Sequence, residues 1–339
     1  MARRRRSFLT SFRSITRNIK TVLTTLAGLG IVGSVGYFSW SGFGDLLTGA
    51  AKAPNIVVAI PPKQDDQIKI GSFNIQNFGK SQLENPQVVA TLAHIAMGFD
   101  VVAIQEISHK HGDALGQLIA KMNEEQAGRF EYLISPLLGK EGGKDTEQFG
   151  FVYDTHRIEL GDSQHGFVVS EKKFRRKFDR LPVVSSFTVK KNLSDDPFTF
   201  SLVTFHNVPN GNPRYREEVA NIKDIYQEVR TILSGEDDII LLGDFNAGYE
   251  KITGSLGPLK RNFTTALTTE MTNVKQTHSY DNLVFDASTT TEFIQGQVLD
   301  FTDICAEYGA APEDVSDHFP VFGSFGVDEN QQVTKVASK

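Results

Sequence analysis

From position 68 onward, the chain alternates short apolar runs with amphipathic stretches. Four runs have the length of buried strands, and they lie at 68–75, 100–105, 198–205 and 238–245. The run FTFSLVTF (198–205) alternates apolar and polar positions most clearly. A further apolar run closes the segment VSDHFPVFGSF (315–325) and predicts another strand.

Two stretches have the period of a helix instead. In 86–97 and in 214–233, apolar residues recur every three or four positions. The expected strands outnumber the expected helices, and several strands follow one another with no helix between them. We therefore predict an α/β domain of about 260 residues, in which two mixed sheets pack face to face with helices outside.

The first 66 residues follow a different pattern. Residues 1–20 carry seven basic side chains and no acidic one, residues 21–44 carry no charge, and residues 45–66 are expected to be a linker. An apolar stretch of about 20 residues can cross a bilayer as a helix, and the basic flank stays in the cytoplasm. This pattern predicts a single-pass membrane anchor that places the folded domain outside the cytoplasm.

Two other interpretations of this segment stay open. Residues 5–10 (RRSFLT) are similar to a twin-arginine export signal, and residues 51–53 (AKA) could be cleaved, which would release a secreted protein. The segment could also be a buried helix of a soluble protein. Its apolar part is longer than the about 7–15 residues of a signal core, which favours the anchor.

The basic residues at the start of the chain make the net charge of the whole chain less negative than that of the rest. The net charge is −6, but residues 21–339 hold 28 basic and 41 acidic side chains. Attraction to nucleic acid would therefore need a local basic patch. The segment EKKFRRKFDR (171–180), with six basic side chains, is such a patch, and its Phe174 and Phe178 could pack on bases. The single cysteine, Cys305, excludes an intrachain disulfide.

Polar side chains gather where the predicted strands begin and end. They are Asn74, Glu106, Glu147, His206, Asp244, Asn246, Asp281, Asp317 and His318. Strand ends are where functional sites assemble in α/β proteins. Carboxylate and amide oxygens suit a hard cation such as Mg²⁺, and a histidine oriented by a carboxylate can transfer a proton. This combination favours hydrolysis of a phosphodiester, in which one histidine deprotonates water and the other protonates the leaving oxygen.

The motifs SFNIQNFG, IQE, GDFNAG, YDN and SDHFPV occur in this order and resemble those of the endonuclease/exonuclease/phosphatase superfamily. SFNIQNFG and SPLLGK (135–140) make the chain most similar to the deoxyribonuclease I branch. The resemblance covers 68–325. It implies a four-layer sandwich of two mixed sheets flanked by helices, a catalytic domain at 67–327 and a metal-dependent endonuclease that cleaves DNA. Residues 328–339 are expected to be a disordered tail.

The resemblance also implies the role of each matching residue. The implied catalytic residues are His206, paired with Glu147, and His318, paired with Asp281, together with Asp244. The implied metal ligands are Glu106, Asn74, Asp244 and Asp317. The implied substrate contacts are Asn246, Arg180 and Asn74. The implied metal is Mg²⁺ or Mn²⁺, and structural Ca²⁺ sites of secreted relatives cannot be assigned to positions in this sequence.

Some positions depart from the family pattern. Asp145 stands where the family has a tyrosine, and Ser108 stands where it has an arginine that enters the minor groove of DNA. Both departures concern the surface that reads DNA and leave the hydrolytic centre intact. Glu141 is a nearby rival of Glu147.

Two alternative functions stay open. The substrate could be a phospholipid or an inositol phosphate, in which case an apolar lip should lie beside the metal. The chain could also be an inactive membrane-anchored scaffold, although a scaffold has no need of both His206 and His318.

Overall fold

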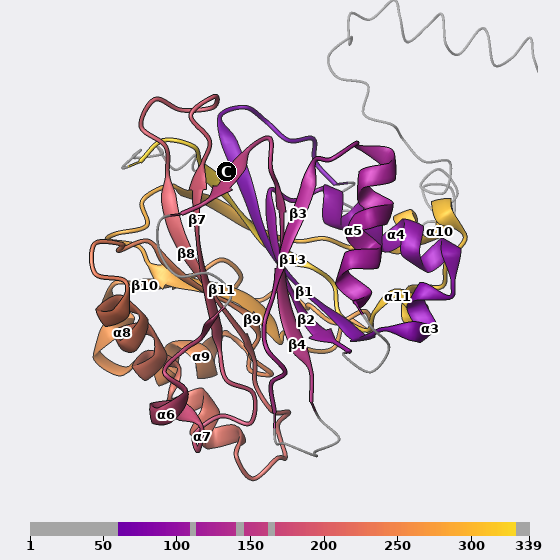
Figure 1. The fold of residues 1–339 in the computed structure, drawn as a ribbon. Coiled ribbons are helices and arrows are strands. Elements are labelled where there is room, and N and C mark those ends of the chain that lie inside the picture. Colours follow the sequence, from indigo (N-terminus) through magenta and orange to yellow (C-terminus); the bar gives the residue numbers. More distant parts are fainter. Residues whose placement is uncertain (1–59, 109–112, 140–145, 162–166, 330–339) are drawn as a thin grey trace, which may run out of the picture. The chain divides into compact units, whose positions relative to one another are not determined.

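Two β-sheets form the centre of the protein, and helices flank them on both outer sides (Figure 1). The computed structural model describes residues 60–108, 113–139, 146–161 and 167–329, which all belong to the unit Val57–Lys339. The predicted four-layer α/β sandwich is confirmed.

One sheet has six strands in the order β12-β13-β1-β2-β4-β3. They are β12 (Phe293–Val298), β13 (Val321–Gly326), β1 (Gln67–Phe78), β2 (Val101–Ile107), β4 (Gln148–Asp154) and β3 (Phe130–Ile134). Strands β1 and β2 are parallel, and the other pairs are antiparallel. Gln67, the first residue of β1, pairs with Gly326, the last residue of β13, so the sheet's first and last strands in the sequence are neighbours.

The other sheet has seven strands. Six follow the order β10-β11-β9-β8-β7-β5, and β6 also pairs with β7. They are β10 (Phe263–Thr265), β11 (Asp281–Asp286), β9 (Ile239–Asp244), β8 (Thr199–His206), β7 (Val183–Val189), β5 (Ile158–Leu160) and β6 (Phe167–Val168). Among the strands that the structure describes in this sheet, β8 and β9 are the pair that runs parallel, so their carboxyl ends lie at the same edge of the sheet.

Helices cover the two outer faces (Figure 1). On the six-stranded sheet they are α3 (Lys80–Leu83), α4 (Pro86–Met97), α5 (Ala114–Glu125), α10 (Thr302–Tyr308) and α11 (Pro312–Val315). On the seven-stranded sheet they are α6 (Glu171–Phe174), α7 (Tyr215–Ala220), α8 (Ile222–Ile232), α9 (Tyr249–Ser255) and the 3₁₀ helix η1 (Gly257–Arg261). A third apolar cluster fills the space between the sheets.

The inner face of β1 changes character along the strand. Ile68 and Ile70 belong to the apolar cluster between the sheets, whereas Ser72 and Asn74, the next residues on that face, are polar and buried. Phe73, on the opposite face, packs under the helices. The space between the sheets is therefore apolar at one end and polar at the other.

Most predicted elements are confirmed, but the helix expected over 214–233 is divided. It forms α7 and α8, with a break at Asn221, whose φ and ψ are −91° and 0°. The Asn221 side chain donates a hydrogen bond to the carbonyl oxygen of Glu217, 2.7 Å away, and accepts one from Lys177. Asparagine side chains that bond to nearby backbone in this way compete with helical hydrogen bonds.

Described residues at both predicted ends of the domain make contacts with it. The end of the expected linker is packed, because Lys63 forms an ion pair with Asp154 at 2.6 Å. Two residues of the expected tail are packed against the domain, since Asp328 accepts a hydrogen bond from Ser194 and Glu329 accepts one from the backbone of Thr199; the rest of the expected tail, from 330 on, lies outside the described residues.

The predicted anchor at 21–44 and the basic segment at 1–20 lie outside the described residues. Within the described part of the chain, no helix combines the length and apolar character needed to cross a membrane. The membrane anchor and the location outside the cytoplasm stay predictions.

Candidate active site

Three strands of the seven-stranded sheet bring functional side chains into one row. His206 ends β8, Asp244 ends β9, and Asp281 begins β11. In the register of the sheet, His206 and Asp281 each pair with Asp244, from opposite sides. The row lies at the polar end of the space between the sheets, because Asn74 of β1 donates a hydrogen bond to Asp244 Oδ2 across that space.

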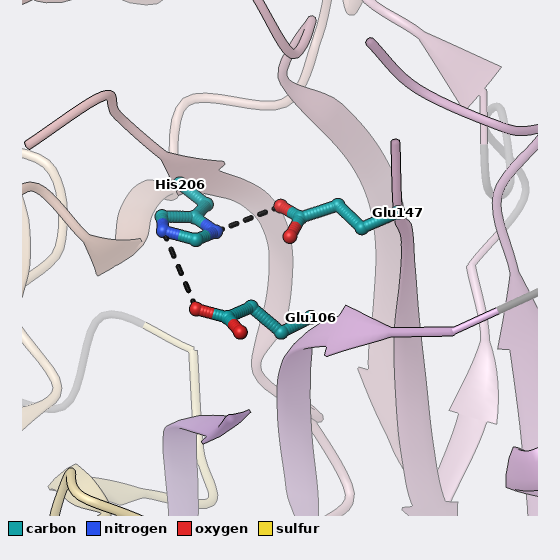
Figure 2. Close-up of side chains that lie close together, drawn as sticks. All are labelled: Glu106, Glu147 and His206. Atoms are coloured by element: carbon teal, nitrogen blue, oxygen red, sulfur yellow. Dashed lines mark hydrogen bonds and ion pairs between the residues drawn. The ribbon is translucent and has the colours of Figure 1, made fainter. Parts of the chain in front are cut away.

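The first histidine is held between two glutamates (Figure 2). His206 Nδ1 lies 2.8 Å from Glu147 Oε1, and His206 Nε2 lies 3.7 Å from Glu106 Oε1. Arg180 Nε donates a hydrogen bond to the carbonyl oxygen of His206 and lies 3.4 Å from Glu147 Oε1. Burial has the largest single effect on the pKa of His206 and acts to lower it, but the charge and hydrogen bond of Glu147, together with the charge of Asp244, raise that pKa overall.

The second histidine has an equivalent partner. His318 Nδ1 lies 2.8 Å from Asp281 Oδ2, and that oxygen also accepts a hydrogen bond from Thr272 Oγ1. Burial acts to lower the pKa of His318, but the charges of Asp281 and Asp244 and the hydrogen bond that His318 donates to Asp281 raise it to about 10. Because each Nδ1 faces a carboxylate, Nε2 is the nitrogen that each histidine presents to the centre of the site.

Asp244 lies between the two histidines. Its Oδ2 is 3.6 Å from His206 Nε2 and 3.8 Å from His318 Nε2, distances too long for hydrogen bonds. Asn74 Nδ2 donates to Asp244 Oδ2 at 3.2 Å and to Glu106 Oε1 at 2.9 Å. Burial raises the pKa of Asp244. The charge of His318 acts to lower this pKa, and the charge of Asp281 raises it further.

A cavity of about 470 Å³ opens over these groups. Its lining is mainly polar and consists of Asn77, Glu106, Ser108, Thr146, Glu147, Asp179, Arg180, His206, Val208, Pro209, Asn212, Asp244, Asn246 and His318. A polar cavity with two histidines is suited to a charged, hydrophilic group such as a phosphoester.

The other predicted site residues lie at the edges of this cavity. Asn246, with a φ of +49°, donates from its backbone to Asp244 Oδ1 and from its side chain to the carbonyl oxygen of Asn207. The Asp317 side chain is 52% exposed, and its Oδ1 is 3.9 Å from His318 Nε2. The structure thus brings together every predicted site residue, while Glu141 and Asp145 lie outside the described residues.

Asn74 is oriented as a donor. Its Oδ1 accepts a hydrogen bond from the backbone of Gln76, and its Nδ2 joins Glu106 to Asp244. In this orientation, Asn74 positions the two carboxylates, and its expected role as a metal ligand stays a prediction.

The site also depends on residues that the motifs do not reveal. Thr272, which is fully buried, donates to Asp281, and Ser316 donates to the backbone of Asn74 while accepting from the backbone of His318. Thr272 precedes its partner by nine positions and lies in no strand or helix. Hydroxyl groups at such positions carry no recognisable signal in a single sequence.

The hypothesis for the basic segment 171–180 is wrong in one respect. Phe174 and Phe178 are 0% and 2% exposed and belong to the core beneath the seven-stranded sheet, so they cannot pack on bases. Arg175 and Arg176 remain exposed. Arg175 lines a second cavity, of about 480 Å³, which shares Thr146 and Asp179 with the first.

The donor set fits a hard divalent cation. Two imidazoles are surrounded by four carboxylates, those of Glu106, Glu147, Asp244 and Asp281. Two of the carboxylate oxygens, Glu106 Oε1 and Asp244 Oδ2, share their neighbours. Among the contacts of the described residues, the only atoms that approach both oxygens are Asn74 Nδ2 and His206 Nε2. A buried carboxylate whose pKa is raised by burial is stabilised by a nearby cation. Oxygen donors of this kind suit Mg²⁺ or Mn²⁺.

Comparison with known proteins agrees with this geometry. Residues 71–318 match the "Endonuclease/Exonuclease/phosphatase family". Over 294 residues, the chain is 30% identical to deoxyribonuclease-1 of Equus caballus, covering 82% of this chain and 98% of that protein. It is 29% identical to deoxyribonuclease-1 of Rattus norvegicus over 269 residues, covering 75% of this chain and 90% of that protein.

Solved structures support the fold. The catalytic domain of human Nocturnin with bound sulfate has a TM-score of 0.54 at 14% identity, covering 79% of this chain and 96% of that one. Humanized TDP2 of D. rerio has a TM-score of 0.51 at 14% identity, covering 77% of this chain and 99% of that one.

Proposed function

Because the chain belongs to the endonuclease/exonuclease/phosphatase family, and so to a family of phosphoester hydrolases, we propose that it is a divalent-metal-dependent endonuclease that hydrolyses DNA. One observation carries this proposal. Two histidines, each oriented by its own carboxylate, direct Nε2 towards the same buried oxygen, Asp244 Oδ2. The similarity to deoxyribonuclease-1 over most of the chain supports DNA as the substrate.

The histidine pair provides the proton transfers of the reaction. In the proposed mechanism, one Nε2 accepts the proton of the attacking water, and the other donates a proton to the oxygen that leaves phosphorus. Glu147 and Asp281 hold the two rings in orientation and stabilise their charged forms. A positioned acid or base typically contributes about 10²–10⁴-fold in rate.

Arg180 is placed to bind the substrate phosphate. Its side chain is 9% exposed, it lines the cavity, and its Nη2 has no hydrogen-bond partner among the described residues. A buried guanidinium nitrogen without an acceptor is costly, and a phosphate oxygen would satisfy it. Asn246, at the same edge of the cavity, is proposed to share this contact.

Glu106 and Asp244 are the residues proposed to hold the metal, with Asp317 near the mouth of the cavity. When bound, the cation would supply positive charge that stabilises the charge developing on the phosphate oxygens. Asn74 keeps the two carboxylates at a fixed separation by donating to both.

A polymer must continue beyond the cleaved bond, and the second cavity offers a path. It adjoins the first through Thr146 and Asp179, and it is lined by Arg175 and Arg214 as well as by Leu137, which is 48% exposed. We propose that these cations contact the phosphates that flank the scissile one.

Nicking of supercoiled plasmid by the purified protein tests the proposal. We expect nicking with Mg²⁺ or Mn²⁺, none with EDTA, and a loss of about 10²-fold or more in His206→Ala and in His318→Ala. The control Glu84→Gln, on the exposed surface, should nick as the parent does.

Absence of nicking by a folded preparation would reject DNA as the substrate. Hydrolysis of a phospholipid or of a small phosphodiester in a parallel assay would then identify the alternative. No hydrolysis of any phosphoester would favour the scaffold.

A further inference from the structure

A buried carboxylate on α7 lies outside the group of predicted site residues. Glu218 is 1% exposed, and it is not among the residues that line the catalytic cavity. A glutamate is rarely buried unless its charge is paired or hydrogen-bonded. The contacts of Glu218 therefore indicate what this carboxylate does in the fold.

Both oxygens of Glu218 accept hydrogen bonds from the backbone. Oε1 accepts one from the backbone nitrogen of Asp179, and Oε2 accepts one from the backbone nitrogen of Val208, each at 2.7 Å. Asp179 directly precedes Arg180, and Val208 lies two positions after His206. One carboxylate thus joins the segment that carries the proposed phosphate-binding arginine to the segment that carries a proposed catalytic histidine.

The same two segments are also bonded to each other directly. Arg180 Nε donates a hydrogen bond to the carbonyl oxygen of His206 at 3.0 Å. The contacts close a ring, which runs from Glu218 through 179–180 to His206 and returns through 206–208 to Glu218. A fully bonded polar network of this kind is rigid, because no member can move without breaking a hydrogen bond.

The charge of Glu218 also acts on this arginine. Burial raises the pKa of Glu218 and the charge of Asp179 adds to the rise, whereas the two backbone hydrogen bonds and the charge of Arg180 act to lower it. The guanidinium is therefore close enough to stabilise the charged form of Glu218. Arg180 Nε also lies 3.4 Å from Glu147, so carboxylates of two separate segments hold this side chain.

We propose that Glu218 is a positioning residue that holds Arg180 at a fixed distance from His206, so that a phosphate bound to Arg180 lies within reach of the histidine. This inference rests on the proposed function, because it concerns the same site. The buried Arg180 Nη2, which makes no hydrogen bond with a described residue, is the atom that would receive the phosphate. Glu218 acts through these two residues and does not touch the substrate.

Glu218→Gln tests this role with little change in size. Its amide has one oxygen in place of two, so one of the two backbone N–H groups loses its acceptor and its segment is no longer fixed. In plasmid nicking with Mg²⁺, we expect kcat/KM to fall about 10-fold. Glu217→Gln is the matched control, because Glu217 is the exposed neighbour on the same helix, and it should nick as the parent does.

A double-mutant cycle with Arg180→Lys separates positioning from a general effect on the fold. Lysine keeps the charge but lacks the planar fork of donors, so the ring is already open in this background. Glu218→Gln should then lower kcat/KM by less than about twofold, because residues that act as a unit are not additive. A fall by the same factor in both backgrounds would overturn the proposal.

Binding of inorganic phosphate to the full chain in EDTA tests the proposal without turnover. The readout is the NMR signal of the Arg180 Nε–H group, assigned as the signal that Arg180→Lys lacks. Phosphate should shift this signal in the parent and in Glu217→Gln, and about 10-fold more phosphate should be needed in Glu218→Gln. No shift in the parent, or equal affinity in Glu218→Gln, would overturn the proposal.

Glu218→Asp gives a second test if the glutamine variant does not fold. It keeps the charge but is one methylene shorter, so it cannot reach both backbone nitrogens, and it should show the same losses. Absence of nicking by the parent would reject the nuclease alone, because the phosphate titration still decides the role of Glu218.

Discussion

The backbone conformation of Glu106 directs its side chain into the candidate active site. Its φ is +61°, and the pairing of β2 with β4 shifts in register between Ile104 and Ile107. Strict alternation would place Glu106 on the face of Val102 and Ile104, under the helices. The motif IQE could predict the role of Glu106, but alternation alone predicts the wrong face, because a bulge adds a residue and redirects the side chain.

Glu147 offers a test of how a carboxylate tunes its histidine. Glu147→Gln keeps the shape but removes the charge that raises the pKa of His206. We expect the rate of plasmid nicking to fall about 10-fold or more, and the limb of the pH–rate profile that reports His206 to move to lower pH. An unmoved profile in a folded variant would show that Glu147 does not set this pKa.

The raised pKa of His318 makes stability depend on pH. The pKa is about 10 in the folded protein, against 6.5 for an ordinary histidine, so the folded state binds the proton more tightly. The resulting stabilisation is complete below pH 6.5 and is lost as the pH rises towards 10. In EDTA, urea unfolding should show up to about 2 kcal/mol less stability at pH 9 than at pH 7 from this group.

His318→Asn is the comparison for this measurement, because it lacks the titrating group. Its free energy of unfolding should change less between pH 7 and pH 9 than that of the parent. Equal changes in the two proteins would mean that the pair with Asp281 contributes nothing that depends on pH.

At the scale of elements, the pairing of strands explains what the sequence could and could not predict. The runs that became β8 and β9 were recognisable from their apolar pattern, and the polar residues at their ends marked the site. Their parallel pairing, and the antiparallel pairing of β11 with β9, depend on contacts across the fold. Local pattern does not contain that information, and only the resemblance to a family implied it.

The segment 171–180, which contains the short helix α6, shows where the sequence pattern was misleading. Its alternation of cations and aromatics looked like a surface for nucleic acid, yet Phe174 anchors the helix in the core. Cations whose neighbours are buried can still be exposed, as Arg175 and Arg176 are. The pattern therefore predicted the charged surface correctly and assigned the wrong role to the aromatics.

Charge reversal directly after α6 tests the path proposed for DNA. In a His206→Ala background, Arg175→Glu/Arg176→Glu should weaken binding to duplex DNA, and the slope of log affinity against log salt should fall by about 0.9 for each phosphate that the variant no longer neutralises. The control Lys190→Glu/Lys191→Glu changes the charge equally at the far end of β7. If both doubles give the same slope, the path lies elsewhere.

On the scale of the whole molecule, the two ends of the sandwich differ in chemistry while the middle is uniform. Apolar residues of both sheets fill the middle, the candidate active site occupies one end, and the carboxylates of Glu236, Asp237 and Asp238 lie close together at the other, before β9. Sequence motifs revealed the first end because its residues stand in recognisable order. They did not reveal the second, since Glu236, Asp237 and Asp238 belong to no motif.

The lone cysteine reports on the integrity of this core. Cys305 of α10 is fully buried, and burial raises its pKa to about 12, so the reactive thiolate is scarce in the folded protein. We expect a thiol reagent to label Cys305 only as urea unfolds the domain, with a midpoint that matches circular dichroism. Rapid labelling of the folded protein would show that α10 opens independently.

The pairing of Gln67 with Gly326 has a consequence for protein engineering. Because the first strand of the sandwich lies directly beside its last, a short peptide could join them and new ends could be opened elsewhere, as in the turn between β7 and β8. The two joined ends also lie far from the catalytic cavity, since β1 runs from Gln67 towards Asn74. A circularly permuted enzyme, or one immobilised on a bead through either end, should therefore keep its cavity open to large substrates.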